Sequence, residues 1–261
     1  MSWSVFPPRT DEIQFDEKWA FVYKKEKHCD PLEEKDQHRG DNWDHVAFDP
    51  THRLVLEVVP GKRSRQGVRQ VVQAAKRRTG GRILRLLTSD EFSAYREEIL
   101  SAYGVQEPVI RTGKPGRPRN PETVPPQDLL YATVHKTRRK GRVVEVEARL
   151  QFGTQEMLDK ALSGSATSTS VNTSFIERHN GTDRHRNSRK TRKTYRFSKD
   201  WDIHNACTFF STYSANFCWP VRSLREKIGI RRYRQRTPAM AAGLTDRIWT
   251  LHEWIAFPAK I

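Results

Sequence analysis

The sequence predicts an α/β fold, because strand and helix patterns alternate along the chain. Residues 13–23 alternate apolar and polar side chains with the period of two that is typical of a strand. Residues 64–78 carry valines and alanine at helical spacing and are followed by two glycines, which commonly end a helix. Residues 82–88 form a short apolar run of strand length, and a helix-like segment follows at residues 91–100. Strands and helices in this order favour a sheet with helices packed on it.

The first predicted strand carries an acid, Asp16, in its middle. Aspartate is disfavoured inside strands, so Asp16 needs either an exposed edge or a functional reason. A polar connection at residues 29–44 comes next. Strands at residues 45–49 and 53–59 then flank a turn at residues 50–52, which predicts a hairpin.

A second acid, Asp90, follows the apolar strand at residues 82–88. In α/β sheets ligands collect beyond the carboxyl ends of the strands, so Asp90 is well placed for chemistry. The alternative is that Asp90 or the serine before it simply caps the next helix. This segment alone leaves both interpretations open.

Residues 111–127 are rich in proline and glycine, which predicts an exposed loop or extended arm. Within it, residues 116–119 resemble the core of an AT-hook, in which Arg117 and Arg119 would enter the minor groove of A·T-rich DNA. The alternative is a plain basic linker, which could still touch phosphates.

A second hairpin is predicted after this loop, with strands at residues 129–135 and 142–150 and a charged turn at residues 136–141. A short helix at residues 155–162 follows. The Ser/Thr-rich residues 163–170 are expected to form a flexible hinge before the next helix.

A third acid, Glu177, lies near the start of that helix, because residues 172–174 are good helix-starting residues. Arg184 comes seven residues later, about two helical turns, so both side chains can share one face. A carboxylate and a cation would then point into one cleft. The alternative is a capping box running from Ser174 to Glu177, in which the carboxylate only satisfies the helix's own N–H groups.

The chain is strongly basic, with 47 Lys and Arg against 31 Asp and Glu, a net charge of +16. Such a field attracts polyanions, so nucleic acid is the expected partner, and a basic protein that only needs solubility is the alternative. From Arg184 to Lys199 the sequence contains no acid. The side chains of this run that we expect to contact phosphates are Arg184, Arg186, Arg189, Lys190, Arg192, Lys193, Arg196 and Lys199.

A helix is predicted at residues 203–218, where aromatic residues share one face and are expected in the core rather than as base-stacking platforms. The tail at residues 237–255 is amphipathic and could cap the domain or bind another copy. The sequence has no apolar stretch of about 20 residues and no signal-peptide pattern, so we expect a cytoplasmic protein without membrane contact. Its three cysteines form no CxxC pair, which indicates neither a zinc ribbon nor a disulfide framework.

Three stretches of sequence resemble one family. They are FDEKWAFV around Asp16, LLTSDEFSAY around Asp90 and NTSFIERHNGTDRHRNSRKTRKTYRFSK around Glu177, supported by NFCWPVRSLR and RTPAMAAGLTDRIWTL further on. In these motifs the chain resembles transposases of the insertion-sequence-one family, the DDE enzymes of small bacterial mobile elements. The third stretch is the most specific, since its opening, its acid, the basic residue seven positions later and its ending occur in the family's order.

The resemblance implies a fold: a ribonuclease-H-like mixed sheet flanked by helices, with a hairpin and loop insertion before the last catalytic helix. Its catalytic domain would begin in residues 1–110, be interrupted by the basic loop at residues 111–128, and be completed by residues 129–218. Residues 219–261 would be a basic and amphipathic extension.

The resemblance also implies a chemistry, metal-dependent cleavage and transfer of DNA strands. Asp16, Asp90 and Glu177 would be the catalytic acids and would hold two Mg²⁺ ions, which Mn²⁺ could replace. Arg184 would hold a phosphate near the scissile bond. The partners would be the double-stranded transposon ends and target DNA, and a second copy of the chain in a synaptic complex, in the nucleoid of a prokaryotic cell.

Two departures from the family pattern accompany the match. The family's upstream zinc-binding and helix-turn-helix elements have no counterpart in the residues before Asp16. The resemblance then implies either the downstream reading frame of a two-frame element, whose upstream product would supply DNA binding, or a truncated copy. Gly181 and Asp183 stand where the family tends to have apolar residues, and a nearby acid could perturb the metal site. A remnant that only binds DNA, and a ribonuclease-H-like nuclease without joining activity, remain as alternatives.

Overall fold

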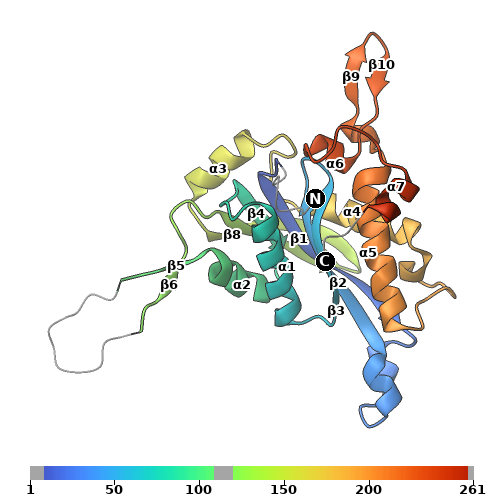
Figure 1. Ribbon diagram of the computed structural model, residues 1–261. Helices are drawn as coiled ribbons and strands as arrows, with labels where there is room; N and C mark the ends of the chain where they lie inside the picture. Colours follow the sequence, from blue (N-terminus) through green and yellow to red (C-terminus); the bar gives the residue numbers. More distant parts are fainter. Residues whose placement is uncertain (1–8, 109–119, 258–261) are drawn as a thin grey trace, which may run out of the picture.

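The computed structural model describes residues 9–108 and 120–257 and contains a six-stranded mixed sheet in the order β3-β2-β1-β4-β7-β8 (Figure 1). The strands are β1 (Glu12–Val22), β2 (Gly40–Asp49), β3 (Leu54–Gly61), β4 (Leu86–Asp90), β7 (Tyr131–Arg139) and β8 (Arg142–Phe152). Strands β1, β4 and β7 are parallel, whereas β2, β3 and β8 join the sheet as antiparallel neighbours.

Helices cover both faces of this sheet (Figure 1). One face packs on α1 (Arg65–Arg78) and α2 (Ala94–Tyr103), and the other on α3 (Gln155–Ser163), α4 (Ser174–Arg186) and α5 (Trp201–Cys218). Consecutive strand residues alternate between the two cores; Ala47, for example, faces α1 while Val46 and Phe48 face α4 and α5. The α/β class and the flanking helices are therefore confirmed.

Shorter elements complete the described chain. They are the 3₁₀ helices η1 (Glu26–His28), η2 (Glu34–His38), η3 (Ser188–Lys190) and η4 (Arg222–Leu224), the strand pairs β5 (Val105–Gln106) with β6 (Thr123–Val124) and β9 (Glu226–Gly229) with β10 (Arg232–Arg234), and the helices α6 (Pro238–Ala241) and α7 (Leu251–Ala256). The AT-hook-like residues Arg117 and Arg119 lie outside the described residues.

The alternation predicted for β1 positions three polar side chains against α4. Gln14 accepts a hydrogen bond from the backbone N–H of Ile176 (3.0 Å), Asp16 accepts one from the Asn180 amide (2.8 Å), and Lys18 donates to Asp183. Because residues two apart on a strand share a face, β1 and α4 are joined at three successive points. This contact fixes where the side chains of α4 meet the strand.

Several predicted boundaries are wrong, and burial of polar groups explains the largest error. The connection expected at residues 29–44 contains η2, and β2 already begins at Gly40. Asn42 and Asp44 look like loop residues in sequence, yet both are fully buried, because His204 lies beside the Asn42 amide (3.1 Å) and Lys18 pairs with Asp44 (3.2 Å).

The charged turn expected at residues 136–141 is also mostly strand, because β7 and β8 are joined by the two residues Lys140 and Gly141. The Ser/Thr-rich segment expected as a hinge is tied down by its hydroxyls, and Thr167 donates to Glu12 at the start of β1 (3.2 Å). On α5, Phe209 and Phe210 are exposed, so the expected aromatic core face is wrong for these two.

No helix in the described part of the chain combines the length and apolar character needed to cross a membrane.

Candidate active site

Asp16 and Asp90 occupy equivalent positions on neighbouring parallel strands. The pairing of β1 with β4 runs from Glu12 opposite Leu86 to Phe15 opposite Ser89. Each residue of β4 in this ladder lies 74 positions after its partner, and Asp16 and Asp90 are the next residues on their strands. The two acids therefore lie side by side at the carboxyl end of β4.

Helix α4 crosses this position and contributes three more side chains to it. Glu177, Asn180 and Arg184 follow one another at spacings of three and four, so they share one face of the helix. Asn180 donates from its amide nitrogen to Asp16 (2.8 Å). The shared face predicted for Glu177 and Arg184 agrees with the electrostatics, since the charges of both residues act on Asp16.

Burial and repulsion between the acids raise the pKa of Asp16 to about 7. Burial has the largest effect, and the charges of Asp90, Glu17 and Glu177 add to it. The backbone N–H of Glu17 opposes the shift by donating to the Asp16 carboxylate (2.9 Å). A carboxyl group whose pKa is raised to about 7 by burial and by neighbouring acids is common at functional sites.

Glu177 does not cap its own helix. The N-cap residue is Thr173, whose side chain makes no capping hydrogen bond. Instead, the Thr173 hydroxyl donates to the Glu177 carboxylate (2.8 Å), and Lys136 of β7 donates to the same carboxylate and to Thr173 (3.0 Å). The capping-box alternative is therefore wrong. The Glu177 side chain is 49% exposed and can reorient.

Asp90 also has a partner from outside the predicted triad. Arg63 lies 4.0 Å from the Asp90 carboxylate and 3.0 Å from that of Glu17, a buried acid on the opposite face of β1. The backbone N–H of Phe92 donates to Asp90 (3.2 Å), while the N-cap residue of α2 is Ser93. Asp90 thus supports the turn after β4 without serving as the N-cap of α2.

Two buried polar atoms around Asp16 have no hydrogen-bond partner among the described residues: the side-chain oxygen of Asn180 and Nε of Arg184. Buried polar atoms are normally paired, so each of these two atoms leaves part of its side chain's hydrogen-bonding capacity unused in this structure. Burial lowers the pKa of Arg184, as does the charge of Arg192, whereas Asp16 raises it.

The basic run from Arg184 to Lys199, which begins in the last turn of α4, is largely exposed. Arg186, Arg192, Lys193, Arg196 and Lys199 are exposed, and Arg184 and Arg189 are partly buried. Part of the segment lines a surface hollow of about 390 Å³ together with Tyr195, whose side chain is 98% exposed.

Lys190 is the exception in this segment, and its predicted phosphate contact is wrong. Its side chain is fully buried and pairs with Asp44 of β2. Burial lowers the pKa of Lys190 to about 8, although the charge of Asp44 opposes the shift. Lys190 therefore anchors the segment to the sheet.

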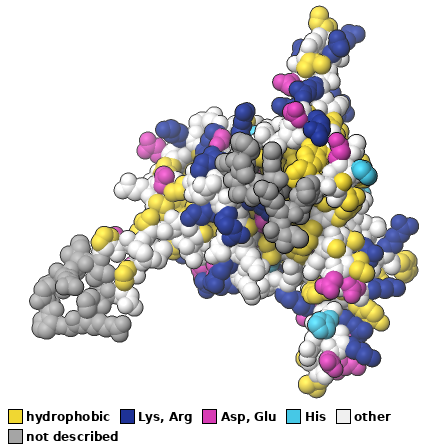
Figure 2. Space-filling model, in the orientation of Figure 1, with side chains coloured by type: hydrophobic (Ala, Val, Ile, Leu, Met, Phe, Trp, Pro, Cys, Tyr) yellow, Lys and Arg dark blue, Asp and Glu magenta, His cyan; other side chains and the backbone are white. Residues whose placement is uncertain are grey.

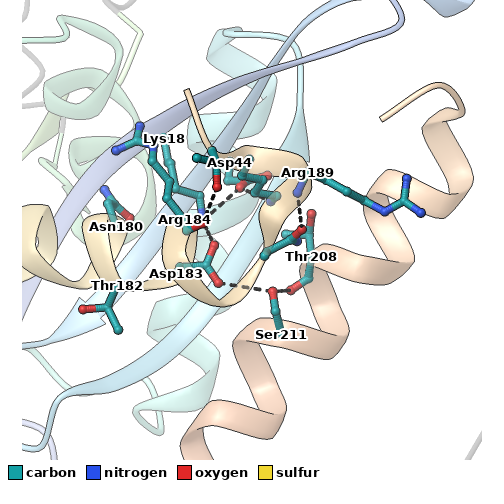
Figure 3. A network of polar contacts seen from close by, with 12 residues as sticks. Lys18, Asp44, Asn180, Thr182, Asp183, Arg184, Arg189, Thr208 and Ser211 are labelled. Carbon is teal, nitrogen blue, oxygen red and sulfur yellow. Dashed lines mark hydrogen bonds and ion pairs between the residues drawn. The ribbon is translucent and has the colours of Figure 1, made fainter. Parts of the chain in front are cut away.

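Lys18, Asp44, Asp183 and Lys190 form a buried ionic network next to the acids (Figure 3). Asp183 points at Lys18 and also accepts a hydrogen bond from Ser211 of α5 (3.2 Å). Burial alone would raise the pKa of Asp183, but the charges of Lys18 and Lys190 outweigh it and hold the pKa at about 2.

Asp183 was expected to perturb the site at Asp16, but its carboxylate is neutralised by Lys18 inside the network. Helix α4 also continues through Gly181, where an added Cβ would meet no atom within 4 Å. The glycine is not required by packing, and it does not interrupt the helix.

The residues present fit Mg²⁺ in their chemistry. Asp16, Asp90 and Glu177 offer only oxygen ligands, the unpaired amide oxygen of Asn180 lies beside Asp16, and Mg²⁺ needs few protein carboxylates because it keeps several waters. In the described chain, no group of three or more His, Cys, Asp or Glu side chains is arranged to hold a metal ion as it stands. Glu177 would first have to leave Lys136, and its exposure permits this.

Sequence reasoning missed Asn180, Lys136 and Arg63. The spacing of Asn180, one turn after Glu177, could have revealed it, because residues three apart on a helix are neighbours. Lys136 was hidden by its assignment to a turn. Arg63 carries no local signal, since it reaches Glu17 across 46 positions.

In the absence of divalent metal, Asp16→Asn should become more stable than wild type as the pH rises. The pKa of Asp16 is about 7 in the folded chain against 3.8 as its ordinary value, so ionisation lowers wild-type stability progressively between about pH 4 and pH 7. The asparagine variant lacks this loss. We expect it to exceed wild type by about 1–3 kcal/mol above pH 7 in urea unfolding, less than the full shift because the amide keeps fewer hydrogen bonds.

The matched control for this prediction is Asp11→Asn, which removes an exposed acid just before β1. The free energy of unfolding of this variant should differ from that of wild type by less than about 1 kcal/mol, because Asp11 is exposed and its pair with Arg85 lies at the surface. Parallel stability curves for wild type and Asp16→Asn from pH 4 to pH 9 would contradict the prediction.

A search of protein-family models finds no match to the sequence, and a search of curated proteins likewise finds none.

Proposed function

We propose that this chain is the catalytic part of a DDE transposase, which cleaves and transfers DNA strands in a metal-dependent reaction. The observation that carries the proposal is the juxtaposition of Asp16 and Asp90 on adjacent parallel strands, with Glu177 and Arg184 brought to Asp16 by α4. The strand order and directions are compatible with a ribonuclease-H-like fold, to which β8 adds an edge strand.

In this proposal Asp16, Asp90 and Glu177 would hold Mg²⁺, which when bound would supply Lewis-acid activation for an in-line displacement at phosphorus. Asn180 orients the Asp16 carboxylate through its amide. Arg184, which is partly buried, would bind a phosphate oxygen through its guanidinium, and the exposed basic side chains after it would bind the flanking duplex. A second copy of the chain would complete a synaptic complex on nucleoid DNA.

The test is a strand-transfer assay with a labelled duplex that carries the element's terminal inverted repeat. We expect cleavage and joined products in Mg²⁺ or Mn²⁺, and none in EDTA. We expect no cleavage of an RNA–DNA hybrid. Cleavage of the hybrid without joined DNA products would instead assign the chain as a ribonuclease-H-like nuclease.

One contact in the site favours a second function, DNA binding without catalysis. Lys136 occupies Glu177 with a charge-assisted hydrogen bond, as it would in a chain that binds DNA without catalysis. Binding of the duplex with no cleavage in either metal, even after a DNA-binding product from upstream is added, would favour that function.

A further inference from the structure

The β9–β10 hairpin projects away from the body of the molecule as a two-stranded arm (Figure 1). From Arg225 to Gln235 every residue is exposed except Gly229, which is partly buried. The arm therefore makes little contact with the rest of the chain, and its side chains are available to a partner.

The base of the arm is nevertheless fixed. The backbone N–H of Val221 donates to the carbonyl of Arg236 (3.0 Å), and the Arg236 guanidinium donates to the carbonyl of Leu224 (2.7 Å). Arg234 donates to the carbonyl of Asp246 (2.7 Å). A fixed base with an exposed tip is suited to reaching a surface at a defined position.

The charge of the arm favours a polyanion as its partner. Between Arg225 and Gln235 there are five Lys or Arg residues and one acid, Glu226, a net charge of +4. The net charge of +16 on a second copy of this chain disfavours a direct contact between the arm and that copy. Duplex DNA presents about one negative charge per 1.7 Å of its axis, and it complements such an arm.

The tip of the arm is apolar, which phosphate binding alone does not explain. Ile228 is 57% exposed and Ile230 is 91% exposed, and Figure 2 shows hydrophobic side chains at the tip with Lys and Arg along the arm. Two branched aliphatic side chains in water gain nothing in the free protein. Proteins that bend DNA commonly place such residues between base steps of the minor groove, where they unstack and kink the duplex.

We propose that the β9–β10 arm is a second DNA contact, in which basic side chains hold the backbone while Ile228 and Ile230 enter the minor groove and bend the duplex. The inference rests on the proposed function only in taking duplex DNA as the partner. It requires neither metal nor the acids at Asp16, Asp90 and Glu177.

The experiment measures binding and bending separately, in EDTA, with the full chain and a duplex of about 30 base pairs that has an A·T-rich centre and a donor and acceptor dye at its ends. Wild type should bring the ends closer and raise energy transfer. Ile228→Ser/Ile230→Ser should bind within about threefold of wild type and lose most of this rise, since the tip supplies the wedge and not the charge.

Two further variants separate the arm from general effects. Lys227→Ala/Arg232→Ala should weaken binding and reduce the slope of log affinity against log salt by up to about 2, close to one for each phosphate that the variant no longer neutralises. Val144→Ser/Val146→Ser on β8 removes two side chains that are each 54% exposed, and it should leave both binding and bending unchanged.

Equal bending by wild type and the isoleucine variant would overturn the arm proposal and leave the proposed function intact. Bending that persists when the minor groove is first saturated with an A·T-specific ligand would also overturn it, because the arm would then lie in the major groove. A wild-type chain that does not bind the duplex would overturn both proposals.

Discussion

Glu177→Gln should abolish metal-dependent strand cleavage while the protein stays folded. The exchange nearly preserves side-chain shape but removes the charge that a divalent cation needs. Loss of residues that only support a metal ligand typically costs 10–100-fold in affinity or activity, so loss of a ligand should cost more than about a hundredfold in the cleavage rate. Because the Glu177 side chain is 49% exposed and its pair with Lys136 lies at the surface, stability should change by less than about 1 kcal/mol.

The matched control is Glu156→Gln, since Glu156 is also an exposed glutamate in the first turn of a helix. Cleavage and joining by this variant should equal those of wild type under the same conditions. Duplex binding by Glu177→Gln, measured in EDTA, should also be unchanged. Wild-type cleavage by Glu177→Gln would remove this residue from the catalytic site.

Lys18→Met should destabilise the protein by about 3–5 kcal/mol at pH 7, because removal of one partner from a buried ionic network leaves carboxylates that are not compensated. Lys18 lies between Asp44 and Asp183 and is 1% exposed. Burial lowers the pKa of Lys18, but these two carboxylates outweigh it and keep the pKa raised, so the side chain is charged. Equilibrium unfolding in urea measures the difference directly.

The pH dependence of this loss provides its control. The pKa of Asp183 is about 2 in the folded chain against 3.8 as its ordinary value, so its contribution is fully present above pH 4 and is lost as the pH falls towards 2. The gap between wild type and Lys18→Met should therefore narrow in that range. Lys18→Met/Asp183→Leu should lose less than the sum of the two single changes, since the remaining network is closer to neutral. A gap below about 1 kcal/mol at pH 7 would show that the network does not stabilise the fold.

The sequence predicted those features of the fold that depend on local periodicity. The alternation around Asp16 and the helical spacing of residues 64–78 correspond to β1 and α1, because neighbouring residues alone determine which face a side chain takes. The common position of Asp16, Asp90 and Glu177 rests on the 74-residue offset of β4 and on the β1–α4 contact. Neither can be derived from periodicity, and only the resemblance suggested them.

The sequence did not predict the buried ion pairs between residues that lie far apart along the chain. Lys190 stands in a run of exposed basic residues and resembles its neighbours, yet it is buried on Asp44, 146 positions away. Asp44 in turn was assigned to a polar connection. Local composition favours solvent for both residues, and their burial is stable because the ionic network with Lys18 and Asp183 neutralises them.

The arm at residues 226–234 escaped prediction for a different reason. Its strands are only four and three residues long, and neither strand has a buried apolar face that would mark it in the sequence. Arg231 in its turn has φ +56°, a conformation that usually indicates glycine or asparagine in sequence. The turn therefore carried none of the usual signals.

The three contacts between β1 and α4 make the length of β1 as important as its composition. Gln14, Asp16 and Lys18 bind the helix backbone, carry the proposed chemistry and neutralise the buried carboxylates, all from one face of the strand. Inserting or deleting a single residue before Gln14 within β1 would turn all three to the opposite face, where α1 and α2 pack. A substitution in β1 therefore changes one of these contacts, whereas a change in the length of the strand would remove helix anchoring, charge balance and acid placement together.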